Sequence, residues 1–251
     1  MKPILLQIKN IKKQYFKNKI LVKEALKDIT FDLYKGEILA LLGANGAGKT
    51  TLSSLIASLH PATSGTIEYN GVSIYDDIIT YRQHLGFCAQ KQHLASHLTV
   101  REHLEYAGRY FLIPDTILQK RVDTLIDMFG LGDFINRDPS ELSGGYKQRL
   151  LIARSIIHKP SLVILDEPTV ALDPHIRRQL WDIIKELKSA GTSIILTTHY
   201  LDEAQALADR ICLLHNGEIK HMDTPQALMN SYNMTNLEDV FIQLMQEEVA
   251  Q

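Results

Sequence analysis

The chain has 251 residues, of which 45% are apolar and 22% are charged, and its 27 basic residues nearly balance its 29 acidic ones. A chain of this size and composition can bury a substantial core, and a formal net charge of -2 gives no electrostatic case for binding nucleic acid or a membrane surface. The two cysteines, Cys88 and Cys212, lack the spacing of metal ligands and suit buried thiols in a reducing cytoplasm.

Apolar runs in this sequence are too short for a membrane helix or for the hydrophobic region of a signal peptide. The run at residues 4–6 becomes polar again at Gln7 and Lys9. No stretch reaches the roughly 18 apolar residues that a membrane helix requires. If the protein works at a membrane, we expect another chain to supply the membrane part.

Strand-like segments dominate the first part of the chain. Residues 4–8 and 29–33 are separated by a lysine-rich segment, and residues 38–42 form a short, continuous apolar strand. A further pair of strands is predicted around Asn70 and Gly71, a dipeptide typical of hairpin turns.

Helical patterns follow from about Gln90 to Pro160, and strands then resume. One helical face is apolar and is predicted to pack in the core: Leu118, Val122, Leu125, Ile126 and Phe129. Continuous apolar runs at residues 162–165 and 194–196 are typical of strands buried on both faces of a parallel sheet. This order predicts an α/β core that a helical subdomain interrupts.

Residues 43–50 match the phosphate-binding loop G-x-x-x-x-G-K-[ST], between an apolar strand and a helical stretch at residues 51–59. Glycines let the backbone wrap tightly, so that its N–H groups and the helix N-terminus face phosphates. Lys49 adds a positive charge for the β- and γ-phosphates, and the Thr50 hydroxyl is a predicted Mg²⁺ ligand. The predicted nucleotide contacts are Gly43, Ala44, Asn45, Gly46, Ala47, Gly48, Lys49, Thr50 and Thr51.

Two adjacent carboxylates, Asp166 and Glu167, end the apolar strand at residues 162–165. At the carboxyl edge of a parallel sheet both can reach the crevice where ligands bind. We expect Asp166 to hold Mg²⁺ through water and Glu167 to polarise the attacking water. Such a pair alone is more often a solvated turn or a helix cap, but here it accompanies the phosphate loop.

A second helix start with exposed backbone N–H groups is predicted at Ser143, Gly144, Gly145 and Tyr146, before an apolar helical run. One nucleotide does not need two such anion-binding ends. The economical interpretation is that this end serves a nucleotide held by a second copy, in a head-to-tail pair. A simple helix cap would explain Ser143 but not the doubled glycine.

Together these residues resemble the ATP-binding-cassette family, whose signature is close to LSGGQ, and the resemblance covers about residues 4–228. It implies an α/β fold with a P-loop NTPase (RecA-like) core, an inserted α-helical subdomain and a small N-terminal antiparallel β subdomain. We expect residues 1–90 and 158–235 to form the core with the N-terminal strands, and residues 91–157 the helical signature subdomain. Residues 236–251 are expected to form a C-terminal helix that Asn236 caps and that packs on its own domain.

The resemblance also implies roles for residues outside these motifs. Tyr15, or Phe16 beside it, resembles the aromatic residue that stacks on adenine, and Gln90 resembles the glutamine that senses Mg²⁺. His199 resembles the histidine that contacts the γ-phosphate, and residues 171–173 the loop that crosses the dimer interface.

Two positions depart from the family pattern, because Tyr146 replaces the usual glutamine of the signature and Ala44 replaces a common proline. We still expect an active ATPase, with altered contacts at the site between subunits.

The resemblance therefore implies an ATP-binding and ATP-hydrolysing homodimer that uses ATP and Mg²⁺ and energises a separate transmembrane permease. Residues 197–204 and 236–241 look most like the exporter branch for drugs, lipids or polysaccharides, of the ABC-2 type. The subunit is then cytoplasmic and peripheral on the inner face of the membrane, without nucleic acid and with membrane contact only through the permease.

Two alternatives come from other functional classes. A cytosolic cassette ATPase of translation or DNA repair generally carries two cassettes or a coiled-coil insertion, and neither occurs here. A kinase with the same loop needs an acceptor site and does not account for residues 143–146.

Overall fold

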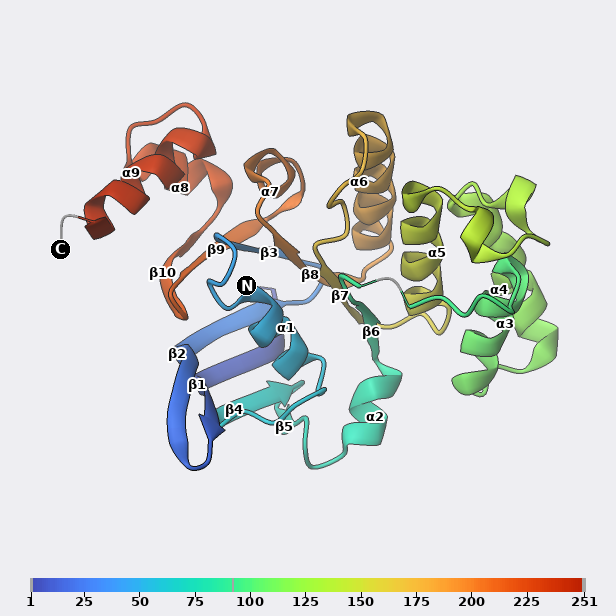
Figure 1. The fold of residues 1–251 in the computed structure, drawn as a ribbon, viewed down its shortest axis with the longest axis horizontal. Coiled ribbons are helices and arrows are strands. Elements are labelled where there is room, and N and C mark those ends of the chain that lie inside the picture. Colours follow the sequence, from blue (N-terminus) through green and yellow to red (C-terminus); the bar gives the residue numbers. More distant parts are fainter. Residues whose placement is uncertain (1, 92, 250–251) are drawn as a thin grey trace.

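The computed structural model describes residues 2–91 and 93–249, which form two β-sheets with helices around them (Figure 1). The larger sheet contains β3 (Ile38–Leu42), β6 (Leu85–Cys88), β7 (Leu162–Asp166), β8 (Ser193–Thr198), β9 (Arg210–His215) and β10 (Glu218–Asp223). The smaller sheet contains β1 (Ile4–Lys17), β2 (Ile20–Tyr34), β4 (Ser64–Tyr69) and β5 (Val72–Ser73). Their strand orders are β10-β9-β3-β8-β7-β6 and β2-β1-β4-β5.

The helices lie on several sides of these sheets. Their bounds are α1 (Lys49–Ile56), α2 (Ile78–Gln83), α3 (Val100–Tyr110), α4 (Asp115–Met128), α5 (Gly144–Ile156), α6 (Pro174–Ser189), α7 (Leu201–Leu207), α8 (Pro225–Ser231) and α9 (Leu237–Val249). Helices α3, α4 and α5 gather at one end of the molecule, and α8 and α9 lie at the other (Figure 1). Within residues 2–91 and 93–249, no helix is long and apolar enough to cross a membrane.

The central strands of the larger sheet are buried on both faces, as their continuous apolar sequences predict. Strand β3 pairs in parallel with β8 and β9, and β7 pairs in parallel with β6 and β8. Successive side chains of a strand alternate between faces. Leu162 and Ile164 therefore pack in the cluster with α1 and the smaller sheet, whereas Val163 and Leu165 pack in the cluster with α3–α6. The parallel strands end together at one edge, which positions the residues that follow them.

Most of the predicted elements are present, with shifted bounds. The predicted helical face at Leu118–Phe129 is buried throughout, and the turn at Asn70 and Gly71 joins β4 to β5. The predicted helix at residues 51–59 instead begins at Lys49 and ends at Ile56, and the short helix α2 was not predicted.

The C-terminal helix packs against its own domain, as expected. Leu237, Val240 and Leu244 are buried in a cluster with α7, α8 and strands β3 and β9. The Asn236 side chain accepts a hydrogen bond from the backbone N–H of Asp239 at 2.8 Å, which caps the helix start. Residues 250 and 251 of the predicted tail lie outside the described residues.

Candidate active site

The phosphate loop connects β3 to α1 and depends on glycine where it enters the helix. Gly48 occupies the position before Lys49 with φ of 113°, a conformation that other residues rarely adopt. A Cβ at Gly48 would also lie 2.8 Å from the Leu26 side chain. The backbone therefore turns sharply into α1, whose first N–H groups face away from the helix and are available to an anion.

A cavity of about 430 Å³ lies over this loop, which is within the usual size of small-molecule sites. Its walls come from β2, the phosphate loop, the loop after β6 and the segments that follow β7 and β8. The lining residues are Lys23, Ala25, Asn45, Gly46, Gly48, Lys49, Thr50, Thr51, Gln90, Glu167, Val170 and His199.

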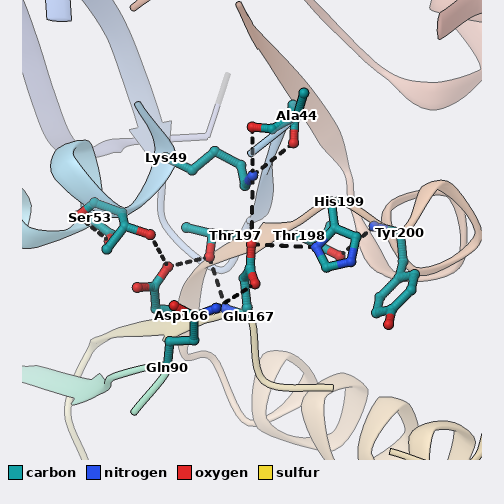
Figure 2. A network of polar contacts seen from close by, with 12 residues as sticks. Ala44, Lys49, Ser53, Gln90, Asp166, Glu167, Thr197, Thr198, His199 and Tyr200 are labelled. Carbon is teal, nitrogen blue, oxygen red and sulfur yellow. Dashed lines mark hydrogen bonds and ion pairs between the residues drawn. The ribbon is translucent and has the colours of Figure 1, made fainter. Parts of the chain in front are cut away.

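Lys49 is folded back onto its own loop, with 4% of its side chain exposed. Its Nζ donates hydrogen bonds to the carbonyl oxygens of Gly43 at 2.7 Å and Ala44 at 3.2 Å, and lies 3.6 Å from Glu167 Oε1 (Figure 2). Burial lowers the pKa of the Lys49 ammonium group, and the Glu167 charge opposes that shift. The ammonium group is thus held at the mouth of the loop, where it can meet a phosphate.

Asp166 forms a buried oxygen-rich point at the end of β7. The Thr197 hydroxyl donates to Asp166 Oδ1 at 2.5 Å, and the Thr50 hydroxyl donates to the same oxygen at 3.4 Å. Burial raises the pKa of the Asp166 carboxyl group, which means that its negative charge is incompletely compensated. Carboxylate and hydroxyl oxygens are the hard ligands that Mg²⁺ prefers, so these residues fit that ion.

Glu167 is the centre of the polar contacts around the cavity (Figure 2). Its Oε2 accepts a hydrogen bond from Gln90 Nε2 at 2.8 Å, and its Oε1 lies 3.4 Å from His199 Nδ1. Its backbone N–H donates to the carbonyl oxygen of Thr197 at 3.1 Å and to the hydroxyl at 2.9 Å.

The backbone of Glu167 is strained, because its φ of 50° lies in the left-handed region. A non-glycine residue in this region costs free energy and persists only where its surroundings hold it. The fold therefore aims this carboxylate into the cavity.

The structure brings together most of the predicted site residues, but not all. Tyr15 is 43% exposed on β1 and does not line the cavity, although its cross-strand partner Lys23 does. Ala47 is buried with its side chain in the core, and Gly43 and Ala44 contribute their carbonyl oxygens.

The signature residues lie apart from this cavity, at the start of α5. Ser143 is in the N-cap position, as predicted, although its side chain makes no capping hydrogen bond. Gly145 is packed so closely that a Cβ there would lie 2.8 Å from Ile176 of α6. Tyr146 is half-buried, with its ring centroid 4.4 Å from that of Phe134 and the Arg149 guanidinium 5.2 Å from its own. The tyrosine side chain therefore packs within the helical region, while the backbone N–H groups start the helix.

Sequence reasoning missed Lys23, Ala25, Val170 and Thr197. Thr197 binds both Asp166 and the Glu167 backbone, and its position just before His199 at a strand end was a usable signal. Lys23 and Ala25 line the cavity only because β2 folds over the phosphate loop. No local sequence motif predicts this tertiary contact.

Comparisons with known proteins agree with this geometry. The family model described as "ABC transporter" matches residues 26–170. The chain is 38% identical over 208 residues to rat "ATP-binding cassette sub-family A member 17", covering 83% of this chain and 12% of that protein. It is 35% identical over 229 residues to "Nod factor export ATP-binding protein I" of Rhizobium johnstonii, covering 91% of this chain and 72% of that one. The sub-family A relatives are thus far longer than the region they share with this chain.

Solved structures of ATP-binding cassettes share this fold at somewhat lower sequence identity. A structure described as the ATP-binding subunit of an ABC transporter has a TM-score of 0.86 and 30% identity, covering 96% of this chain and 99% of that chain. A dimeric ATP-binding cassette in a post-hydrolysis state with ADP and Pi has a TM-score of 0.80 and 28% identity, covering 88% and 98% of the two chains.

Proposed function

This chain belongs to the ABC transporter family, and we propose that it is the ATP-binding and ATP-hydrolysing subunit of an exporter whose transmembrane permease is a separate chain. The observation that carries the proposal is the placement of Glu167, which Lys49, Gln90 and His199 approach at the wall of the cavity. A binding module would not need a strained carboxylate at the phosphate end of its pocket.

Nucleotide binding uses the loop and its lysine. The backbone N–H groups of residues 43–48 and the start of α1 bind the phosphates, and Lys49 exchanges the Gly43 and Ala44 carbonyl oxygens for phosphate oxygens. Tyr15 stacks on adenine at the edge of the site beside Lys23. Thr50, Asp166 and Gln90 would hold Mg²⁺, Asp166 through water, and the ion would supply positive charge for the β- and γ-phosphates.

Hydrolysis uses Glu167 as the group that orients and polarises water. Its carboxylate accepts a proton from water as the γ-phosphate is attacked, and Gln90 and His199 fix its two oxygens. His199 lines the same cavity, and its Nε2 donates to a γ-phosphate oxygen when the ring carries a proton on both nitrogens.

The separation of residues 143–146 from the cavity supports a composite site. Ser143 and Gly144 are exposed at the start of a helix of 13 residues, and Ser143 makes no capping bond to that helix. In a head-to-tail homodimer the Ser143 hydroxyl and the N–H groups of Gly144, Gly145 and Tyr146 contact ATP held by the other copy. Tyr146 contributes packing that holds this helix start rather than a polar side chain.

A groove on another face supports contact with the permease. It has a volume of about 280 Å³ and lies where α2, β6 and the ends of α3 and α5 meet. Its walls include the exposed Leu59 and Tyr110, with the basic Arg82 and Arg154 beside them. An apolar groove with a cationic rim suits a short amphipathic segment of a membrane protein. Binding of that segment holds this subunit on the cytoplasmic face of the membrane.

Two experiments test the function. Purified chain should release phosphate from ATP with Mg²⁺, and Lys49→Ala should abolish this release, whereas Lys120→Ala on the surface of α4 should not. Equal activity of Lys49→Ala and the parent chain would contradict the proposed site.

Partner recovery tests the transport role. Tagged chain purified from gently solubilised membranes should bring down a membrane protein of several spans, and Tyr110→Ser should weaken that recovery. Tyr106→Ser is the matched control, because Tyr106 is 58% exposed on the same helix but does not line the groove. Recovery with ribosomes in place of a membrane protein would favour a non-transport cassette.

A further inference from the structure

Glu203 is a carboxylate buried in the protein, with 0% of the residue exposed, on the helix that follows His199. Burying a carboxylate costs free energy unless donors compensate it. Among the described residues it forms no salt bridge, because the nearby Arg177 pairs with Asp202 at 3.4 Å. The fold therefore retains a costly group for which packing alone gives no reason.

One oxygen of Glu203 joins three separate segments. Its Oε1 accepts a hydrogen bond from the Thr169 hydroxyl at 2.8 Å and another from Trp181 Nε1 at 3.0 Å. Thr169 lies in the turn after β7, Trp181 lies on α6, and Glu203 itself lies on α7. Thr169 is 1% exposed, so its hydroxyl has no access to bulk water.

The turn that contains Thr169 and the helix that contains Glu203 each follow a residue that lines the cavity. Thr169 follows Glu167 by two residues, and the next residue, Val170, lines the cavity. Glu203 follows His199 by four residues, in the first turn of α7. The contact between Glu167 Oε1 and His199 Nδ1 is 3.4 Å long and spans the same two segments. The segment after β7 and the segment after β8 are therefore joined twice. The Glu167–His199 contact forms one connection, and the hydrogen bond from Thr169 to Glu203 forms the other.

We propose that Glu203 is a positioning residue that holds the turn after Glu167 at a fixed distance from the segment carrying His199. This inference rests on the proposed function, because it assigns the geometry of the same hydrolytic site. The Glu203 Oε1 is the shared acceptor for a hydroxyl and an indole N–H, whereas its Oε2 is buried without a partner among the described residues. Loss of the link lets the turn shift, and small displacements of a catalytic group lower the rate without changing substrate binding.

The test removes the link at its smallest partner. Thr169→Val keeps the shape of the side chain and removes only the donor. We expect kcat for ATP hydrolysis to fall roughly tenfold with an unchanged KM. Thr124→Val is the matched control, since Thr124 is an exposed threonine whose hydroxyl bonds only to Lys120 of its own helix among the described residues, and its kcat should stay at the parent value.

Two further variants separate positioning from folding. Glu203→Gln retains an acceptor oxygen and should recover most of kcat, whereas Glu203→Leu should lose it and shift the emission of Trp181, the only tryptophan in the chain. Combining Glu203→Leu with Thr169→Val should lower kcat no further than the worse single variant. Parental kcat in Thr169→Val, or additive losses in the double variant, would overturn the inference. If the parent chain hydrolyses no ATP, the proposed function itself fails, and the two failures are thereby distinguished.

Discussion

His158 should make the stability of this protein fall in mild acid. The residue lies in the loop between α5 and β7, and its ring stacks on Phe111 with ring centroids 3.6 Å apart. Its Nε2 carries the proton, because it donates to the Leu85 carbonyl oxygen at 3.0 Å. Its Nδ1 is buried and has no partner among the described residues. Burial lowers the pKa of His158 to about 4, so the folded state holds the ring neutral.

The direction of the effect follows from proton linkage. In the unfolded chain a histidine has a pKa of about 6.5, so below that value the unfolded state binds more protons than the folded state. The contribution of His158 to stability is complete above about pH 6.5 and is lost as the pH falls towards the folded pKa of about 4. For a fully buried ring the loss from pH 7 to 5 would be about 2 kcal/mol, and partial exposure of this ring reduces the expected loss to about 1 kcal/mol.

The assay is urea unfolding of the parent chain and His158→Phe at pH 7, 6 and 5. The variant keeps the stacking on Phe111 but leaves the Leu85 carbonyl oxygen without its donor, so it should be less stable at pH 7 by about 1 kcal/mol. The difference in free energy of unfolding between the parent chain and His158→Phe should become smaller as the pH falls. The parent loses stability as His158 takes up a proton, whereas phenylalanine takes up none. His60→Phe, at an exposed position, should follow the parent curve. An equal loss of stability with pH in His158→Phe and the parent would refute the reasoning.

Two further predictions concern packing. Gly65→Ala should destabilise the chain by about 2 kcal/mol more than Gly71→Ala, because both glycines have positive φ but only at Gly65 would a Cβ lie 2.4 Å from the Asn10 carbonyl oxygen. Chemical unfolding of the two variants measures the difference, and equal losses would contradict the steric argument. Tyr146→Phe should keep the melting temperature and ATPase activity of the parent chain. Tyr146→Ala should lower the free energy of unfolding by about 3 kcal/mol, because it removes the contacts to Phe134 and Arg149. A thermal melt and a phosphate-release assay check both variants, and a loss of activity in Tyr146→Phe would indicate that the hydroxyl is used.

Sequence reasoning succeeded where the chemistry is local. The phosphate loop and the Asp166–Glu167 pair could be placed because glycine spacing and an apolar strand fix the backbone around them. The alternating contacts of β7 also follow from its continuous apolar sequence.

Contacts that depend on tertiary packing could not be predicted. Lys23 reaches the cavity because β2 crosses the phosphate loop, and the register shifts within β1 obscure any simple alternation there. The Tyr146 side chain packs against Phe134 and Arg149, and its place in the signature did not indicate these contacts. Ser143 occupies the predicted N-cap position, but a residue type that favours an N-cap does not fix the direction of its hydroxyl, and no side-chain capping bond forms.

The central claim is that Glu167 drives hydrolysis in a site shared between two copies of the chain. Glu167→Gln keeps the size of the side chain and the contact from Gln90, but it removes the base that accepts a proton from water. Size-exclusion chromatography of this variant with ATP and Mg²⁺ should show a stable dimer, and a second change, Ser143→Arg, should return it to a monomer. A Glu167→Gln variant that binds ATP and stays monomeric would contradict the shared site.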